Sequence, residues 1–254
     1  YWPGPLTMIF EKSEAVPYGT TGGLDTVAVR MPSDEVARAL IDAGGGYIAA
    51  PSANTSGRPS PTMAEHVEED LTGRIDMILD GGPVSIGLES TILDMTVTPP
   101  MILRPGAITK EMLEACIGEV TVDKAVIKPN QRPKAPGMKY RHYAPKADLS
   151  IVEGEMSKVI PKINELAAEQ VKAGHKVGII GTEESVANYT CGDVKSIGTR
   201  EDESTIAVHL FAILREFDAD QVDYIYSESF DTEGIGSAIM NRLLKAAGHH
   251  VITV

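Results

Sequence analysis

The sequence predicts an α/β protein with two domains, a first domain built on a twisted open sheet and a smaller second domain with a parallel, Rossmann-like sheet. Short apolar runs rich in β-branched residues alternate with amphipathic stretches along the whole chain, and one proline-rich segment interrupts them. The 254 residues, 43% of them hydrophobic, are enough to bury two modest cores. We therefore place the first domain at residues 1–122, an extended linker at 123–148 and the second domain at 149–254.

The first domain begins with predicted strands at residues 6–10 and 26–30, which are rich in apolar and β-branched side chains. A helix is expected over residues 34–43, because Ser33 or Asp34 can cap its start and the glycines that follow can end it. Further strands are predicted at 47–50, 77–79, 91–94 and 101–103, and further helices at 62–71 and 110–117.

The linker differs in composition from both neighbours. Prolines recur through it and deny regular structure, and lysines and arginines make it locally basic. An extended spacer is the simplest interpretation. Residues 139–143, KYRHY, nevertheless carry more functional groups than a spacer needs.

The second domain alternates short apolar strands with helices, the pattern of a doubly wound parallel sheet. Strands are predicted at 149–152, 176–180, 193–197, 223–226 and 250–254. Helices are predicted at 157–173, 203–217 and 235–247.

Composition excludes several classes of function. A net charge of −13, from 36 acidic and 23 basic residues, disfavours stable binding of long nucleic acids but permits a small anionic ligand in a pocket. No apolar run approaches the roughly 20 residues that span a bilayer, so no membrane association is expected. Two cysteines far apart in sequence, Cys116 and Cys191, suit a reduced cytoplasmic protein. The chain starts at Tyr1, without Met and just before a predicted strand, and we expect a further segment to precede it.

A polar loop at residues 50–62 is the strongest candidate for phosphate binding. It leaves a predicted strand and enters a predicted helix, and it contains the hydroxyls of Ser52 and Ser60 and the carboxamide of Asn54. Neutral donors beside a helix N-terminus bind phosphate oxygens without net positive charge. An ordinary Ser/Thr/Pro turn is the alternative.

Two arginines at predicted strand ends could supply positive charge. Arg30 ends one strand and Arg104 ends another, and open α/β sheets place ligands at such positions. A guanidinium can hold a carboxylate or phosphate through two hydrogen bonds, although either arginine could also be a surface charge. Ser90 opens a neighbouring strand, where its hydroxyl can bind a small polar substrate or cap a turn.

Other familiar sites are missing from the sequence. It has no Gly-Lys-Ser/Thr loop of a P-loop nucleotidase, no zinc-ligand spacing of Cys and His, and no Gly-x-Ser-x-Gly elbow. Residues 234–238, GIGSA, are a partial dinucleotide fingerprint, but they precede the last helix instead of following the first strand.

Several separated motifs, in order along almost the entire chain, resemble the two-domain threonylcarbamoyl-AMP synthases. Similarity to the YrdC-like domain of that family rests on residues 2–7 (WPGPLT), 26–32 (TVAVRMP), 51–57 (PSANTSG), 89–92 (ESTI) and 103–106 (LRPG). Residues 136–145 (PGMKYRHYAP) resemble the family's linker, and 234–243 (GIGSAIMNRL) its C-terminal domain. An N-terminal Lys/Arg-containing motif and a threonine of the family have no counterpart here.

The resemblance implies an L-threonylcarbamoyladenylate synthase, a nucleotidyltransferase that makes threonylcarbamoyl-AMP and pyrophosphate from L-threonine, bicarbonate and ATP. It needs no protein nucleophile. Mg²⁺ is expected to arrive mainly with ATP, and a separate transferase is expected to take the product to tRNA for t6A modification. The residues implied for ATP are Thr26, Ser52, Asn54, Ser60, Arg104 and Tyr143, and those implied for threonine are Arg30 and Ser90. Tyr143, with His142, would cover the nucleotide.

Three other functions stay open at this point. The YrdC-like fold resembles double-stranded-RNA binders, so a non-catalytic RNA- or tRNA-binding module is one alternative, which the negative charge disfavours. A YrdC-type carbamoyltransferase is another, but it should bring acylphosphatase and zinc-finger modules. The third is a non-catalytic scaffold.

Overall fold

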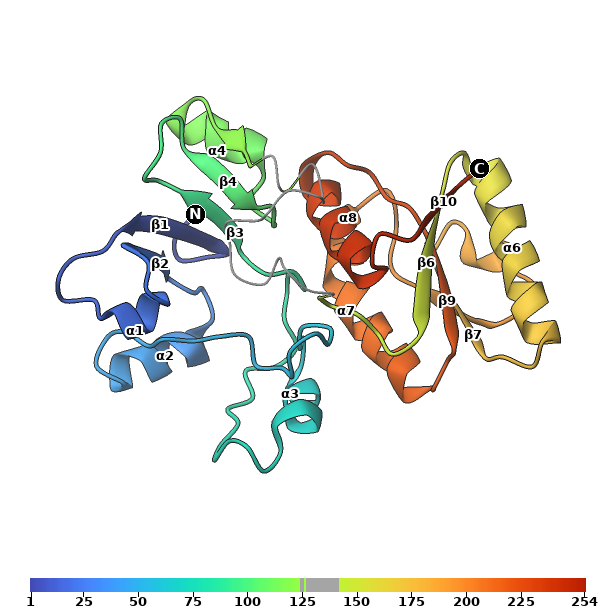
Figure 1. Ribbon diagram of the computed structural model, residues 1–254, viewed down its shortest axis with the longest axis horizontal. Coiled ribbons are helices and arrows are strands. Elements are labelled where there is room, and N and C mark those ends of the chain that lie inside the picture. Colours follow the sequence, from blue (N-terminus) through green and yellow to red (C-terminus); the bar gives the residue numbers. More distant parts are fainter. Residues whose placement is uncertain (124–125, 127–141) are drawn as a thin grey trace. The chain divides into compact units, whose positions relative to one another are not determined.

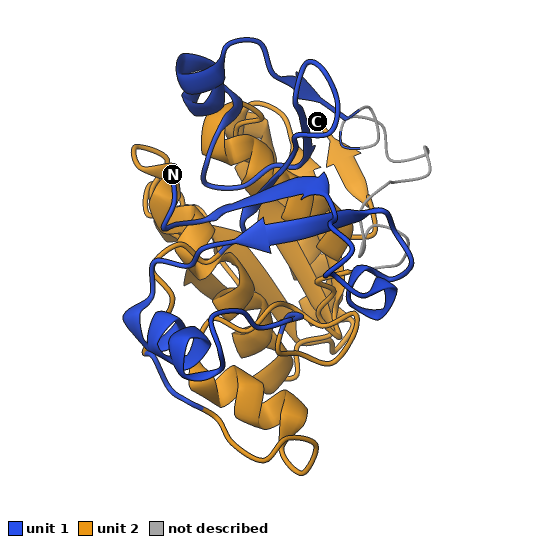
Figure 2. Cartoon of the chain, turned by 90° about the vertical axis from the view of Figure 1, so that its left-hand side faces the viewer, with its two compact units in different colours: residues 1–52, 79–81, 88–139 blue, residues 53–78, 82–87, 140–254 orange. Residues whose placement is uncertain are grey.

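The computed structural model describes residues 1–123, 126 and 142–254 (Figure 1). The chain divides into two compact units, which Figure 2 colours separately. Unit 1 comprises Tyr1–Ser52, Leu79–Gly81 and the described residues of Leu88–Lys139. Unit 2 comprises Ala53–Ile78, Gly82–Gly87 and the described residues of Tyr140–Val254. The boundaries predicted at 122 and 148 stay a prediction.

Unit 1 is built on a five-stranded mixed sheet with the order β2-β1-β3-β4-β5. Its strands are β1 (Leu6–Glu11), β2 (Thr26–Arg30), β3 (Thr91–Asp94), β4 (Met101–Arg104) and β5 (Thr121–Val122). The β1–β2 and β3–β4 pairs are antiparallel, whereas β1–β3 and β4–β5 are parallel. The core of the unit is formed by Leu6, Leu93, Ile102, Ile108, Leu113 and Val120.

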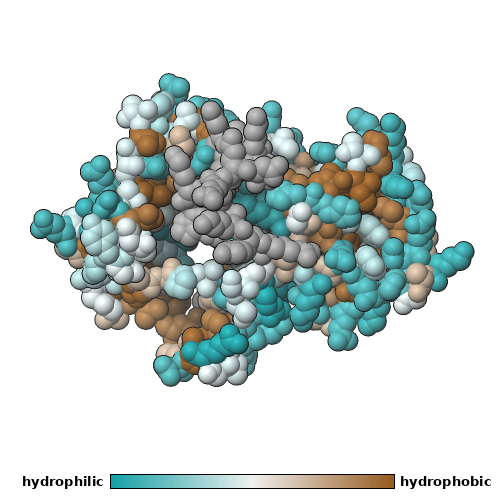
Figure 3. Space-filling view, viewed as in Figure 1, coloured by the Kyte–Doolittle hydropathy of each residue, from teal (hydrophilic) through white to brown (hydrophobic). Residues whose placement is uncertain are grey.

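Among the described residues of unit 1, three helices accompany this sheet: α1 (Tyr18–Thr21), α2 (Glu35–Ala43) and α4 (Lys110–Ile117). Thr109 caps α4 by accepting a hydrogen bond from the amide of Met112, and Asp34 caps α2 in the same way. Helix α4 buries Leu113 in the core, whereas α2 has no buried residue. Hydrophobic side chains are accordingly visible on the surface of this unit (Figure 3).

Two predicted strands of the first domain are wrong. Residues 47–50 and 77–79 form no helix or strand. Tyr47 is 87% exposed and Met77 is 74% exposed, so these short apolar runs do not pack on a sheet. An apolar run becomes a strand only where a partner strand satisfies its backbone groups, and periodicity alone cannot reveal that partner.

Unit 2 contains a five-stranded sheet with the order β10-β6-β9-β7-β8, and every pair in it is parallel. The strands are β6 (Asp148–Glu153), β7 (Val177–Gly181), β8 (Asp193–Ser196), β9 (Tyr224–Glu228) and β10 (Val251–Thr253). Its helices are α3 (Ala64–Leu71), α6 (Met156–Lys172), η1 (Val186–Asn188), α7 (Glu203–Ala219) and α8 (Gly234–Ala246).

The parallel sheet is covered on both faces, with α6 on one side and α7 and α8 on the other (Figure 1). All five residues of β7 are buried, as expected for a central parallel strand. Helix α7 packs closely, because a Cβ at Gly178 of β7 would lie 2.6 Å from the ring of Phe217. The predicted fold class, two α/β parts with the second sheet parallel, is confirmed.

Unit 2 also includes the polar stretch from Ala53 to Ile78, with α3 inside it. From Ala53 to Met63 this stretch has no helix or strand. The loop predicted to bind phosphate thus belongs to the same compact unit as the parallel sheet, from Ala53 onward.

Candidate functional site

One row of paired residues crosses four adjacent strands of the mixed sheet in unit 1. Arg30 on β2 pairs with Thr7 on β1, Thr7 pairs with Ile92 on β3, and Ile92 pairs with Arg104 on β4. Residues paired across strands point to the same face, so Arg30 and Thr7 share one face of the sheet. The β3–β4 register is irregular beside Ile92, but the hydrogen bonds of Ser90 to Thr7 and to Arg104 place Arg104 on that face as well. Three strand spacings separate the Cα atoms of Arg30 and Arg104 by about 14 Å.

Hydrogen bonds tie the middle of this row to Ser90, the residue before β3. The Arg104 guanidinium donates to the carbonyl oxygen of Ser90 at 3.1 Å and to its hydroxyl at 3.2 Å. The hydroxyls of Thr7 and Ser90 are 2.7 Å apart. Ser90, implied for threonine, and Arg104, implied for ATP, are therefore direct neighbours.

Arg30 is fixed at the other end of the row. Its Nε donates to the carbonyl oxygen of Gly4 at 3.0 Å. Partial desolvation lowers the pKa of Arg30, but a guanidinium stays charged at any physiological pH. Arg30 is exposed as a whole residue.

The remaining predicted residues of unit 1 are less constrained. Thr26 starts β2, four residues before Arg30, so it lies on the same face but roughly 13 Å away along the strand. Ser52 is exposed and belongs to no helix or strand. The prediction that Arg30, Ser52, Asn54, Ser90 and Arg104 line one cavity stays a prediction.

Asn54 and Ser60 belong to the polar loop in unit 2. The Asn54 amide donates to the carbonyl oxygens of Thr55 at 3.0 Å and Arg58 at 3.3 Å, which stiffens the loop from inside. Within the described residues, the buried side-chain oxygen of Asn54 has no hydrogen-bond partner, so it can accept a bond from a ligand. Ser60 is buried, and the backbone amide of Thr62 donates to His66 Nδ1 at 3.1 Å where the loop approaches α3.

Tyr143 lies beside this loop. The amide of Ala144, the next residue, donates to the carbonyl oxygen of Gly57 at 2.9 Å. The Tyr143 ring packs on Phe211 of α7, with ring centroids 5.0 Å apart, and its backbone is left-handed with φ of 64°. The three residues implied for ATP in this unit are thus gathered around one loop and one helix. The other residues of the KYRHY segment, 139–141, lie outside the described residues.

A buried ion-pair cluster supports the loop from below. Asp70, at the end of α3, forms ion pairs with Arg58 of the loop and with Arg215 of α7. Burial raises the pKa of Asp70, but hydrogen bonds from Arg215 and from the Thr55 amide outweigh it, so the pKa lies below its usual value. Asp70 is therefore ionised at neutral pH.

The sequence did not point to Thr7, Asp70 or Arg215. Thr7 stood inside the WPGPLT motif but was not assigned a role. Asp70 resembles any surface acid of an amphipathic helix. Arg215 carried one usable signal, a lone cation at a position of α7 where the helical period predicts an apolar residue.

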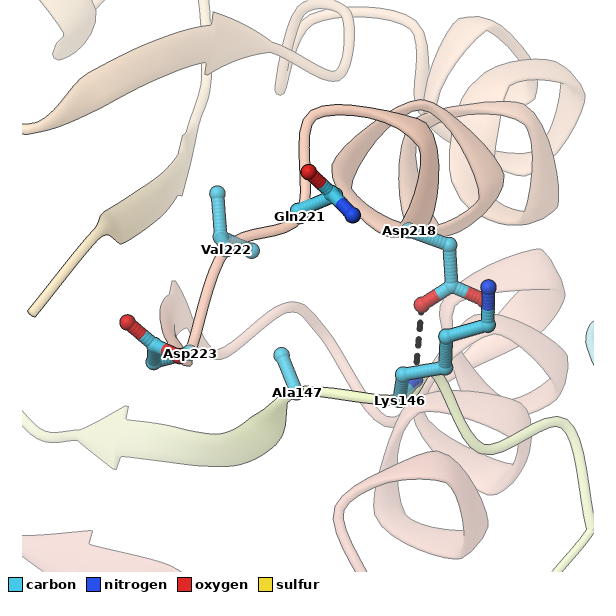
Figure 4. Close-up of a pocket in the computed structure, with 6 residues that line it drawn as sticks. All are labelled: Lys146, Ala147, Asp218, Gln221, Val222 and Asp223. Atoms are coloured by element: carbon cyan, nitrogen blue, oxygen red, sulfur yellow. Dashed lines mark hydrogen bonds between the residues drawn. The ribbon is translucent and has the colours of Figure 1, made fainter.

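A cavity of about 310 Å³ in unit 2 is not the predicted site (Figure 4). It is lined by Lys146, Ala147, Asp218, Gln221, Val222 and Asp223. These residues precede β6 and β9 or end α7, so the cavity lies at the amino ends of the strands, whereas parallel sheets bind ligands at the carboxyl ends. Figure 4 shows the Asp218 carboxylate turned toward the amide of Lys146, which donates to it at 2.6 Å.

The described ranges contain no group of three or more His, Cys, Asp or Glu residues placed to hold a metal ion. The implied ATP residues offer hydroxyls, an amide and a guanidinium instead of carboxylates, which suits a metal ion that is bound mainly by phosphate oxygens. In the same ranges, every helix is too short or too polar to cross a bilayer.

Comparison with known families matches both parts of the chain. Residues 1–106 match the family described as "Telomere recombination", and residues 108–248 match the family described as "Threonylcarbamoyl-AMP synthase, C-terminal domain".

Two curated relatives are similar over nearly the whole chain. A threonylcarbamoyl-AMP synthase of Bacillus subtilis is 51% identical over 253 residues, which are 99% of this chain and 72% of the relative. A threonylcarbamoyl-AMP synthase of Pyrococcus abyssi is 50% identical over 255 residues, covering 100% of this chain and 73% of the relative.

A solved structure has the same fold. The crystal structure of P. abyssi Sua5 complexed with L-threonine matches with a TM-score of 0.91 and 49% identity, over 100% of this chain and 73% of that one. Since these similarities extend through both units at about half identical residues, the chain belongs to the threonylcarbamoyl-AMP synthase family.

Proposed function

We propose that the protein is an L-threonylcarbamoyladenylate synthase, which makes threonylcarbamoyl-AMP and pyrophosphate from L-threonine, bicarbonate and ATP. The observation that carries the proposal is the similarity of the whole chain, at 49% identity, to a Sua5 structure with L-threonine bound. The row from Arg30 to Arg104 supports it, because it places two cations on one sheet and the buried hydroxyl of Ser90 is bonded to one of them.

In the proposed reaction the threonine amine attacks bicarbonate, and loss of water leaves an N-carboxylate. One oxygen of that carboxylate attacks the α-phosphorus of ATP, the bond to the β-phosphate oxygen breaks, and pyrophosphate leaves. The product is a mixed anhydride of a carbamic acid and AMP. Catalysis of this kind depends on positioning and on stabilising developing negative charge, not on a protein nucleophile.

Arg30 is proposed to bind the threonine carboxylate, and Ser90 to bind the polar atoms of the same substrate. Arg104 is proposed to bind ATP phosphate oxygens. The hydrogen bonds between Ser90 and Arg104 support this division, because the N-carboxylate and the α-phosphate must lie side by side before they react.

The nucleotide would be held by Thr26, Ser52, Asn54 and Ser60 and covered by Tyr143. The free acceptor oxygen of Asn54 supports a polar ligand at that loop. A cover would exclude water, which otherwise hydrolyses the carbamate or the anhydride.

Mg²⁺ is proposed to enter with ATP and to neutralise phosphate charge, held mainly by the phosphates. We place the enzyme in the cytoplasm, where its proposed substrates and tRNA occur together. A separate transferase would then carry the threonylcarbamoyl group to adenosine in tRNA.

The test is pyrophosphate release by the purified full-length protein. We expect release only when ATP, L-threonine and bicarbonate are all present, with threonylcarbamoyl-AMP detected by mass spectrometry. L-Serine should be poorer, because it lacks a methyl group whose burial contributes roughly 1–3 kcal/mol. Pyrophosphate release without threonine would refute the function.

A further inference from the structure

One face of helix α7 contacts three chain segments that lie outside the helices and strands around it: the polar loop, the stretch that ends at Gly87, and residues 143–146. The contacts are made at positions 208, 211, 215 and 218, a spacing of three and four residues that keeps them on one side of the helix. Phe211 packs on Tyr143, and Asp218 accepts a hydrogen bond from the Lys146 amide. At Gly87 the approach is so close that a Cβ would lie 2.5 Å from the Cα of Val208.

The third of these positions, Arg215, grips the polar loop directly. Its Nε and NH2 groups donate to the carbonyl oxygen of Pro59 at 3.1 and 2.7 Å. Its NH2 and NH1 groups also donate to the two carboxylate oxygens of Asp70, at 2.8 and 3.3 Å. The side chain of Arg215 is only 2% exposed and that of Asp70 is fully buried.

This arrangement fixes the backbone next to both ATP-binding candidates of the loop. The Pro59 carbonyl belongs to the peptide bond that joins Pro59 to Ser60. Asp70 accepts a hydrogen bond from the amide of Thr55 at 3.1 Å, and that amide joins Thr55 to Asn54. One ion pair therefore holds the peptides adjacent to Ser60 and Asn54.

The loop contains no helix or strand from Ala53 to Met63. Besides a few backbone hydrogen bonds of its own and of its neighbours, its backbone groups depend on side chains for partners. A guanidinium has five donors in a planar fork, so Arg215 makes two hydrogen bonds to a carbonyl and two to a carboxylate, whereas a lysine ammonium has only three donors and no fork. Burial of an arginine charge lowers stability unless its donors are paired, so Arg215 is stable at this position only with the Pro59 carbonyl and a carboxylate beside it.

We propose that Arg215, with Asp70, is a positioning residue that holds Asn54 and Ser60 in the geometry that binds ATP, so that α7 of the parallel-sheet domain forms the base of the nucleotide site. The proposal rests on the proposed function and deepens it. It gives the second domain a defined role in the reaction, which is to position Asn54 and Ser60 through Arg215 of α7.

The test compares Arg215→Ala and Arg215→Lys with Glu216→Gln in the full-length protein. Glu216 is the matched control, because it is the next residue of the same helix and its charge pairs only with the partly exposed Lys195 among the described residues. We expect Arg215→Ala to raise the KM for ATP by about 10- to 100-fold, since small displacements of binding groups are that costly, with the KM for threonine unchanged. Arg215→Lys should recover part of the loss, and Glu216→Gln should behave as the wild type.

Asp70→Asn provides the second variant. It should raise the KM for ATP in the same way, and the Arg215→Lys/Asp70→Asn double variant should be less impaired than the sum of the two single variants, because both changes break one contact. ATP binding by calorimetry and urea unfolding of each variant separate misplacement of the loop from loss of the fold.

The proposal is overturned if an Arg215 variant that is folded by urea unfolding keeps the wild-type KM for ATP, or if the KM values for ATP and threonine rise equally. The proposed function fails separately, in the wild-type assay, if pyrophosphate release does not need threonine.

Discussion

The predicted site residues of unit 1 and those of unit 2 are held in place by different means. In unit 1, Arg30, Ser90 and Arg104 are placed by a ladder of paired strands, and backbone hydrogen bonds define their positions. In unit 2, Asn54 and Ser60 stand on a loop without regular structure, and a buried ion pair defines theirs. The predicted site residues Arg30, Ser90 and Arg104 are thus built into a sheet, whereas Asn54 and Ser60 depend on a few charged side chains.

The two kinds of support should respond differently to mutation. In a strand ladder many backbone hydrogen bonds share the stabilisation of the backbone, so the loss of one side chain leaves the backbone in place. In the loop a single buried ion pair provides much of that stabilisation, and removal of one partner leaves an uncompensated charge in the interior. Mutations should therefore affect stability strongly in the loop and mainly chemistry in the sheet.

The largest expected effect is that of Asp70→Ala on stability. The change leaves Arg215, 2% exposed, with only the half-exposed Glu69 as a carboxylate partner among the described residues, and we expect a loss of about 3–5 kcal/mol in the free energy of unfolding. Urea unfolding measures it. The control is Glu69→Ala: the Glu69 side chain is 51% exposed although it pairs with the same two arginines, and its loss should cost under about 1 kcal/mol. Equal losses from the two variants would remove the distinction between the two kinds of support.

The next effect concerns the sheet of unit 1 and should appear in kinetics. Arg30→Ala should raise the KM for threonine and Arg104→Ala the KM for ATP, each by about 100-fold, because each removes a charge-assisted contact to an anion. Steady-state pyrophosphate release with each substrate varied in turn separates the two. Both variants should unfold within about 1 kcal/mol of the wild type, since their backbones lie in a ladder. If both arginines act on the same substrate, the proposed division of the row is wrong.

The contrast between the two kinds of support also explains what sequence reasoning could and could not find. Strand-end residues such as Arg30 and Arg104 are visible because the apolar runs before them predict strands, and the fold class predicted from those runs is confirmed. The apolar runs at 47–50 and 77–79 misled the same reasoning, because their side chains are exposed.

The residues that support the polar loop could not be predicted from the sequence for another reason. Asp70 and Arg215 are 145 residues apart, and no periodic pattern links an acid on a short amphipathic helix to a cation on a long apolar one. Local patterns predict elements, whereas a buried ion pair is a property of tertiary packing. For this reason the sequence suggested Asn54 and Ser60 as candidates but not Asp70 and Arg215, which hold the loop.

A smaller expected effect is a difference between Asp70 and Asp218 in how each affects stability as pH changes. Both are buried carboxylates that face Arg58. The pKa of Asp70 lies below its usual value, so its stabilising contribution is present above about pH 4 and is lost as pH falls further. Burial raises the pKa of Asp218, so the ionised form costs stability, and that cost appears as pH rises above the same region.

Asp218→Asn should therefore stabilise the protein at pH 7 by about 1 kcal/mol, because asparagine keeps the acceptor for the Lys146 amide and removes the buried charge. Asp70→Asn should destabilise it at the same pH and lose that effect in acid. Urea unfolding between about pH 3 and about pH 8 follows both variants, within the range where carboxylates titrate. A destabilised Asp218→Asn protein would mean that the contact with Arg58, 3.7 Å away, outweighs burial.

The smallest expected effect tests the centre of the row, at Thr7. Its hydroxyl is 2.7 Å from that of Ser90, and Ser90 also accepts a hydrogen bond from Arg104. Thr7→Val keeps the β-branched shape that suits a strand but removes the oxygen, so the Ser90 hydroxyl loses one of two partners that orient it. One neutral hydrogen bond contributes about 1 kcal/mol, which corresponds to roughly a five-fold rise in the KM for threonine. Thr7→Ser keeps the hydroxyl and should stay close to the wild type, and both variants should unfold at the same urea concentration within error. If valine and serine at this position give the same KM for threonine, the hydroxyl of Ser90 is oriented by Arg104 alone. Arg30 and Arg104 would then contribute to substrate binding, whereas Thr7 would not.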